Sequence, residues 1–203
     1  ILSEDDPSPN FIGSWFMKDD SVCDGLVNYF ETNSGLQQAG SVSGGIDLEL
    51  KNSVDINLTP KEIRGPGNEI FEEYFQSLFH CYSDYVVQWP FLRSFAKLEA
   101  CAFNLQRYES GQHFQALHAE RTALDTLHRV FAFMTYLNDV PEENGGSTSF
   151  EHYGLEVQPQ KGLTLIWPAE WTHAHKGNKI LNGFKLIITG WLHFPTKKEG
   201  HLI

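Results

Sequence analysis

The segment NLQRYESGQHFQALHAE, residues 104–120, ends in the His-x-Glu pair of His118 and Glu120. On a β-strand, residues i and i+2 lie on the same face, so these two side chains project together while Ala119 points to the other face. Two metal ligands can therefore reach one ion from a single short segment. The pair is a weak signal by itself, because polar residues two apart are common on strands and the chain has 9 histidines.

A third ligand has to come from another part of the chain. His173 and His175 also lie two apart, so either is a candidate, and His113 and His128 are weaker candidates. Two imidazoles and one carboxylate bind one face of a non-heme iron(II) ion and leave the opposite positions open. Those positions are enough for a bidentate 2-oxo acid and for dioxygen. The same residues also fit a zinc hydrolase site with an activated water.

Lys185 is a cation in an apolar run, FKLIITGWL, ten residues after His175. An unpaired ammonium is costly to bury in such a strand, and a bound carboxylate would compensate its charge. The 2-oxo acid most used in this chemistry carries a distal carboxylate that needs such a cation. The alternative is that Lys185 reaches solvent along its alkyl chain or pairs with an acidic side chain of the core.

The second half of the chain consists of short β-rich runs separated by turn residues, most clearly Asn144-Gly145-Gly146 and Lys161-Gly162. Eight such runs after a helical N-terminal region predict a mainly β, α+β chain. Its core is expected to be a double-stranded β-helix (jelly roll) buttressed by helices. The predicted strands span about 99–108, 113–119, 128–137, 147–151, 154–158, 162–167, 173–176 and 184–194.

Two helices are predicted before these strands. Apolar residues recur at helical spacing over 21–31, behind capping candidates at Asp20 and Ser21. A broader apolar stripe runs from Asn68 to about Trp89, where the following proline ends the helix.

The region between the two helices is rich in Gly and Ser and is predicted to be loop, with one short strand at 46–50. No repeat or linker requires a second domain, and 203 residues with 41% hydrophobic residues fit one core. We therefore expect a single domain over 1–203. Residues 1–97 form its helical support region, and residues 98–195 form the jelly-roll core with the metal site.

The bulk properties restrict the partners. A formal charge of −11 and a pI near 5.2 argue against binding nucleic acid or an anionic membrane. No run has the length of a membrane span, and residues 1–10, which do not begin with Met, lack the features of a signal peptide. Three widely spaced cysteines suggest neither a disulfide framework nor a thiolate zinc site, so we expect a reducing, cytoplasmic compartment.

Other catalytic motifs are missing from the sequence. It contains no G-x-S-x-G nucleophile elbow, and Cys101 has no evident base, which disfavours serine and cysteine hydrolases. It contains neither a G-x-G-x-x-G fingerprint nor a P-loop, so binding of a dinucleotide or a nucleoside triphosphate has no support.

Three stretches together resemble a known family: residues 104–120, RVFAFMTYLNDVPEENGGSTSFE at 129–151, and KGLTLIWPAEWTHAHKGNKILNGFKLIITGWLHF at 161–194. Their order resembles the prolyl 4-hydroxylase-like branch of the iron(II)/2-oxoglutarate dioxygenases. The segment WTHAHKG is most similar to the bacterial and phage-type members. The resemblance covers residues 99–195, and it implies a jelly-roll hydroxylase that uses iron(II), 2-oxoglutarate and dioxygen.

The resemblance also implies roles for individual residues. It makes His118 and Glu120 iron ligands and selects His175 over His173, because the family's lysine follows its distal histidine by ten residues. It further implies that the distal carboxylate of 2-oxoglutarate is held by Lys185, Tyr108 and Thr148.

Arg129, Trp191 and His193 match positions that line the substrate mouth of similar hydroxylases and are the expected catalytic-site residues. Lys185, Trp191 and His193 have the same parity on their strand, which is an independent physical reason to group them. Tyr136 is expected to pack in the core.

Two features depart from the family pattern. Glu120 stands where the family more commonly has Asp, which could shift the iron, permit bidentate ligation or loosen the site. One extra residue separates Tyr108 from His118.

We expect hydroxylation of a C–H bond, with peptidyl proline as the first candidate, succinate and carbon dioxide as co-products, and ascorbate as reductant. The alternatives are a free amino acid or small metabolite as substrate, and a non-catalytic jelly-roll binding protein with a vestigial metal site.

Overall fold

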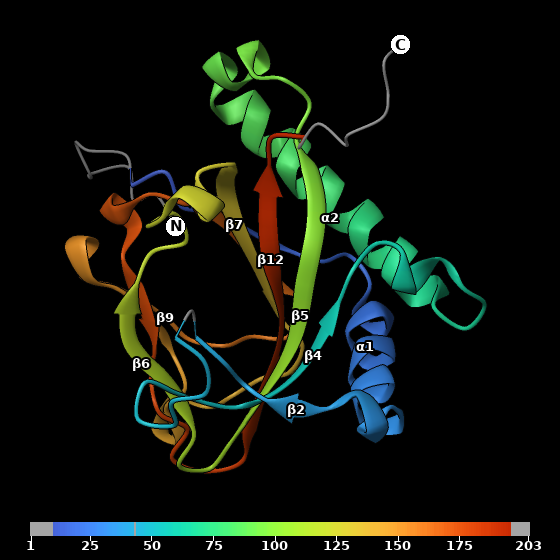
Figure 1. Cartoon of the computed structure of the whole chain (residues 1–203), viewed down its shortest axis with the longest axis vertical. Coiled ribbons are helices and arrows are strands. Elements are labelled where there is room, and N and C mark those ends of the chain that lie inside the picture. Colours follow the sequence, from blue (N-terminus) through green and yellow to red (C-terminus); the bar gives the residue numbers. More distant parts are fainter. Residues whose placement is uncertain (1–9, 43, 196–203) are drawn as a thin grey trace.

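The computed structural model of the chain describes residues 10–42 and 44–195. These residues form two antiparallel sheets, neither of which closes into a barrel. Figure 1 shows α1 and α2 along one side of the strands β4, β5 and β12, with β6 and β9 on the opposite side. The predicted fold, a jelly roll buttressed by helices, is confirmed.

The larger sheet has seven strands, and the smaller sheet has five. In spatial order the larger sheet contains β1 (Gly13–Phe16), β10 (Leu163–Pro168), β7 (Arg129–Tyr136), β12 (Phe184–His193), β5 (Glu99–Glu109), β4 (Val54–Leu58) and β2 (Gln38–Ala39). The smaller sheet contains β3 (Lys51–Asn52), β6 (His113–His118), β11 (His175–Gly177), β8 (Thr148–Phe150) and β9 (Leu155–Val157).

Both predicted helices are present, as α1 (Asp20–Thr32) and α2 (Glu69–Gln88). The carboxylate of Asp19, one residue before the predicted cap, accepts a hydrogen bond from the Ser21 amide at 2.8 Å and so begins α1. The following proline ends α2 at Gln88. Neither of these helices combines the length and apolar character needed to cross a membrane.

The strands of the larger sheet divide the core into two layers, because successive side chains point to opposite faces. On β12, Leu186, Ile188 and Leu192 pack in the layer that contains the helices. Ile187, on the other face, packs in the layer between the sheets. The predicted parity therefore sorts these residues correctly, and Lys185 and Trp191 share the face of Ile187. The layer between the sheets is where the candidate site lies.

All eight predicted strands are present, and their ends differ from the prediction by two residues at most. The strand expected at 173–176 starts only at His175, because Trp171–His173 form a 3-10 turn. The prediction of a strand at 46–50 is wrong. The side chain of Asp47 accepts a hydrogen bond from the Glu49 amide at 3.0 Å and stabilises a turn there.

Four strands that the sequence did not predict, β1 to β4, lie before residue 98 and join both sheets. Each spans five residues or fewer. The two to four residues of β1, β2 and β3 carry too little periodicity to be recognised from sequence, whereas the alternation of apolar and polar residues in β4 (VDINL) is a strand signal that our prediction missed. All three cysteines lie in the described part of the chain, and none of them forms a disulfide.

A buried chain of hydroxyl groups connects α2 to the larger sheet and generates a testable prediction. The Tyr74 hydroxyl lies 3.1 Å from Thr135 Oγ1, which lies 2.8 Å from Thr164 Oγ1. Tyr74→Phe removes one buried hydrogen bond and leaves the threonine pair intact, so the free energy of unfolding should fall by about 1 kcal/mol. Urea denaturation measures this. Tyr82→Phe, in the same helix, is the control and should change stability less.

Candidate metal centre

The antiparallel register of two strands brings the first two candidate ligands together. His175, the first residue of β11, lies directly opposite His118, the last residue of β6. Their ring centroids are 4.4 Å apart. A shift of one residue in this pairing would turn one imidazole to the other face of the sheet, so the register itself determines that the rings meet.

Both imidazoles are held by backbone carbonyl groups. His118 Nδ1 lies 2.8 Å from the Ala116 carbonyl oxygen, and His175 Nδ1 lies 2.9 Å from the His173 carbonyl oxygen. A carbonyl oxygen can only accept, so each Nδ1 carries a proton, and Nε2 is the nitrogen that remains to bind a metal. This arrangement fixes the tautomer that binds a metal through Nε2.

Glu120 completes the cluster from just beyond the end of β6. Its amide and that of Arg121 donate to the carbonyl oxygen of Ala169, at 3.2 Å and 3.0 Å, which anchors the segment to the loop after β10. Its Oε1 lies 3.3 Å from His175 Nε2 and 3.7 Å from His118 Nε2. Among the described residues, these three are the only group of possible metal ligands that converges in this way.

The electrostatics of the cluster favour the protonation states that bind a cation. Burial and the neighbouring His175 lower the pKa of His118 to about 4, so its imidazole is neutral at pH 7. Burial alone would raise the pKa of Glu120. The hydrogen bond and charge interaction with His175, with smaller contributions from His118 and Trp191, outweigh burial and lower it to about 2. Neutral imidazoles and an ionised carboxylate are the ligand forms that metal binding requires.

Aromatic side chains surround both imidazoles. The Phe114 ring stacks on His118 with centroids 4.0 Å apart, and Trp167 and Phe150 contact His175 at 5.0 Å and 5.6 Å. The sequence did not single out these three residues. The signal that could have found Phe114 is its position four residues before His118, on the same face of β6.

The other candidate histidines lie elsewhere. His173 Nε2 lies 2.7 Å from the carbonyl oxygen of Asn10, so its ring contacts the N-terminal segment. His113 accepts a hydrogen bond from the Gln115 amide, and His128 packs edge-on against His193. The alternative third ligands left open by the sequence are therefore not part of the cluster.

Lys185 is buried, with 3% of its surface exposed. Its ammonium donates to the Gly146 carbonyl oxygen at 2.7 Å and lies 4.9 Å from the centre of the Tyr108 ring. A Cβ added at Gly177 would lie 3.7 Å from Nζ, so the side chain extends from β12 to the smaller sheet. Within the described residues, no carboxylate pairs with it.

Tyr108 and Thr148 have partners inside the same layer. Tyr108 lies opposite Lys185 in the pairing of β5 and β12, and its hydroxyl donates to Gln106 Oε1 at 2.8 Å. Thr148 Oγ1 accepts a hydrogen bond from the Tyr136 hydroxyl at 2.7 Å. Tyr136 is fully buried, as expected, but it also orients Thr148. The contact of Gln106 with Tyr108 was not predicted from the sequence, although the two residues lie on the same face of β5.

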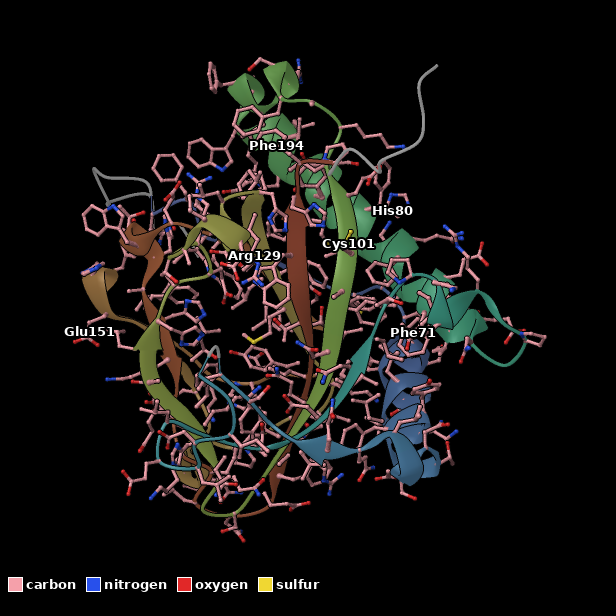
Figure 2. The ribbon with its side chains drawn as sticks, in the orientation of Figure 1. Phe71, His80, Cys101, Arg129, Glu151 and Phe194 are labelled. Carbon is pink, nitrogen blue, oxygen red and sulfur yellow. The ribbon has the colours of Figure 1, made fainter. Side chains whose placement is uncertain are left out.

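Arg129 and Trp191 lie beside Glu120. The Arg129 guanidinium carbon is 3.7 Å from the centre of the Trp191 ring, and the indole Nε1 donates to Glu120 Oε2 at 2.7 Å. In the view of Figure 2, Arg129 lies between β6 and β12. His193 is farther along β12, where its ring packs edge-on against His128 at 4.8 Å and its Nδ1 bonds the Phe194 carbonyl oxygen.

Two hollows on the surface of α2 lie away from this cluster. They have volumes of about 940 and 570 Å³, and both contact Ile63, Phe75 and Phe79. Neither is lined by any of the nine predicted site residues.

The donor set fits a non-heme iron(II) ion, since two imidazole nitrogens and one carboxylate oxygen occupy one side of a common centre. The buried ammonium without a carboxylate partner also fits an acid with a second, distal carboxylate.

Comparison with protein families agrees with this chemistry: residues 103–193 match the model of the 2OG-Fe(II) oxygenase superfamily. These residues form a 2OG-Fe(II) oxygenase domain. The family resemblance of the motifs and the prediction of a dioxygenase are thereby confirmed.

Solved structures share the fold of this oxygenase domain at low sequence identity. A viral collagen prolyl hydroxylase from Paramecium bursaria Chlorella virus-1, in complex with 2-oxoglutarate, is 18% identical. The match covers 91% of this chain and 97% of that chain with a TM-score of 0.65. A prolyl-4-hydroxylase from Pseudomonas putida is 16% identical, with coverages of 92% and 94% and a TM-score of 0.69.

A prolyl hydroxylase from Trichoplax adhaerens, in complex with a peptide fragment of the hypoxia inducible factor oxygen degradation domain, is 14% identical. That match covers 91% of this chain and 84% of the other, with a TM-score of 0.71. A comparison with curated proteins gave no match.

The different surroundings of His173 and His175 generate a prediction about metal binding. His175→Ala should weaken Mn(II) or Co(II) binding by more than about 100-fold, since loss of an outer partner of a metal ligand alone costs roughly 10- to 100-fold. His173→Ala should leave the metal affinity near that of the wild type, because only its backbone carbonyl contacts His175. Calorimetric titration of both variants measures this. Equal losses would show that the ligand assignment is wrong.

Proposed function

We propose that this protein hydroxylates a C–H bond of a peptidyl proline, with iron(II) bound by His118, Glu120 and His175. When bound, iron(II) together with 2-oxoglutarate and dioxygen supplies the oxidant for the C–H bond. One oxygen atom of dioxygen enters the product and the other enters succinate, with loss of carbon dioxide. Ascorbate is the expected reductant for iron that becomes oxidised.

The observation that carries the proposal is the pairing of this metal-ligand cluster with the buried ammonium of Lys185. A lysine at 3% exposure without a carboxylate partner is destabilising unless a ligand supplies the negative charge. A dicarboxylic 2-oxo acid binds the metal at one end and needs a cation at the other. Tyr108 and Thr148 are proposed to bind the same distal carboxylate.

Peptidyl proline is the first choice of substrate for two reasons. The fold is shared with prolyl hydroxylases from a virus, a bacterium and an animal. The stacked pair of Arg129 and Trp191 offers a flat, partly exposed surface beside Glu120, which suits a small ring held near the metal. His193 is proposed to contribute to the outer part of this mouth.

Lys185 also weighs against the other candidate functions. A zinc hydrolase site would explain the three ligands but would not use a buried cation in the same layer. A non-catalytic jelly roll would have no ligand to compensate the charge. Hydroxylation of a free amino acid or small metabolite uses the same machinery and is distinguished by the substrate screen below.

The test of the function is a mass-spectrometric screen of proline-containing peptides and free amino acids with iron(II), ascorbate and 2-oxoglutarate. We expect a peptide to gain the mass of one oxygen atom while succinate accumulates in equal amount. Lys185→Met should abolish this reaction and weaken 2-oxoglutarate binding by at least about 30-fold, the effect of about 2 kcal/mol lost when one member of a buried charge pair is removed.

The Lys185→Met variant also distinguishes a role of Lys185 in binding 2-oxoglutarate from a role in stabilising the fold. Lys185→Met should be at least as stable as the wild type to urea, because it replaces an unpaired buried ammonium by an apolar chain of similar length. Lys176→Met, which alters a partly exposed lysine that pairs with Glu151, is the control and should retain activity. Oxidation of free amino acids but of no peptide would contradict the peptidyl assignment.

Binding of 2-oxoglutarate should depend on pH through Lys185. Burial lowers the pKa of its ammonium to about 7, and a bound carboxylate raises that pKa. The free protein therefore loses the proton above pH 7 while the complex keeps it. The Kd should be nearly constant below that pH and rise up to tenfold per pH unit above it.

Calorimetry with saturating Mn(II), from about pH 6 to 9 in buffers of different ionisation enthalpy, measures both the Kd and the proton uptake. The pKa of His118, about 4, places its titration outside this range. A Kd that does not change with pH would contradict the assignment of Lys185.

A further inference from the structure

The two carboxylate oxygens of Glu120 have different partners. Oε1 faces the two imidazoles, at 3.3 Å from His175 Nε2 and 3.7 Å from His118 Nε2. Oε2 faces away from them and accepts a hydrogen bond from the indole Nε1 of Trp191 at 2.7 Å. The hydrogen bond is charge-assisted and largely buried, since the Glu120 side chain is 14% exposed.

The different partners of the two oxygens matter because residue 120 is a glutamate rather than the shorter aspartate. A glutamate has one more rotatable bond than an aspartate, so its carboxylate can turn until both oxygens reach the same ion. Bidentate binding would occupy one of the positions that an iron(II) site of this type leaves open for exogenous ligands. We propose that Trp191 is a positioning residue that holds Glu120 in monodentate coordination by engaging Oε2.

Arg129 restrains the indole in this position. Its guanidinium stacks on the Trp191 ring at 3.7 Å, and its Nη1 donates to the backbone carbonyl oxygen of Glu120 at 3.0 Å. The same residue thus fixes the backbone of the ligand and the plane of the indole that binds its side chain. The Arg129 Nη1 is itself 3.8 Å from Oε2, so positive charge also lies on the side of that oxygen.

The pairing of strands in the larger sheet places a second tryptophan, Trp167, two strands away from Trp191. Ala132 of β7 lies between Trp191 of β12 and Trp167 of β10. Trp167 contacts His175 with its ring, and its buried Nε1 has no hydrogen-bond partner among the described residues. Of these two tryptophans, only Trp191 donates a hydrogen bond to a ligand side chain, which makes its N–H group a specific target for mutation.

The experiment uses Co(II) alone, without 2-oxoglutarate or peptide. It rests on the metal-site part of the proposed function and not on the substrate. Trp191→Phe keeps an aromatic ring under Arg129 and removes the N–H donor. We expect its Co(II) affinity to fall by about 10- to 100-fold, as for other partners that orient metal ligands, and the d–d absorption of the bound ion to change.

Two controls separate this role from a general loss of structure. Trp171→Phe, at a tryptophan 68% exposed to solvent, should leave both readouts unchanged. In a Glu120→Asp background, the shorter carboxylate no longer reaches the indole, so Trp191→Phe should cause little further loss of affinity. Circular dichroism verifies the fold of each variant.

If the smaller Phe ring prevents folding, site-specific replacement of Trp191 by β-(3-benzothienyl)alanine keeps the bicyclic shape and lacks the N–H. A Trp191 variant with the affinity and Co(II) spectrum of the wild type would overturn the inference, as would additive losses in the double variant. A wild-type protein that binds no Co(II) would instead overturn the proposed function.

Discussion

The contact of one buried carboxylate with two imidazoles is the interaction on which the rest of the interior depends. Glu120 is stabilised as an anion by His175, His118 and the Trp191 indole, despite the cost of its burial. When both rings are neutral, as metal binding requires, the cluster carries a net negative charge that a divalent cation can satisfy. The carbonyl groups that hold each Nδ1 orient both rings so that their Nε2 atoms face the same carboxylate oxygen.

The second constraint is the buried cation in the same layer of the core. The Lys185 ammonium contacts a backbone carbonyl oxygen and an aromatic ring, and no carboxylate of the described residues pairs with it. An anionic cluster and an isolated ammonium between the same two sheets form a site with complementary charge for a metal ion and a dicarboxylic acid. Burial disfavours the charged form of Lys185 in the free protein, and a bound carboxylate makes that charge favourable.

Much of this arrangement follows from the alternation of side chains along each strand, in which every second residue lies on the same face. The alternation on β12 assigns Lys185 and Trp191 to one face and the helix-packing residues to the other, and the structure agrees. The eight strands of the second half were recognisable because turn residues separate them clearly, although β8, β9 and β11 span only three residues each. Strands β1, β2 and β3 were not, because runs of two to four residues carry little periodicity and form strands through pairing with longer neighbours.

The sequence alone determined the types of ligand, the order of the motifs and the face on which each side chain lies, since these depend on local spacing. Residue spacing left the third ligand open between His173 and His175, and the family resemblance selected His175, but only the tertiary structure gives the physical reason. A 3-10 turn directs His173 to Asn10, while pairing with β6 places His175 opposite His118. The hydrogen bond of Trp191 to Glu120 was likewise invisible in the sequence, because contacts between residues 71 positions apart depend on how remote strands are paired.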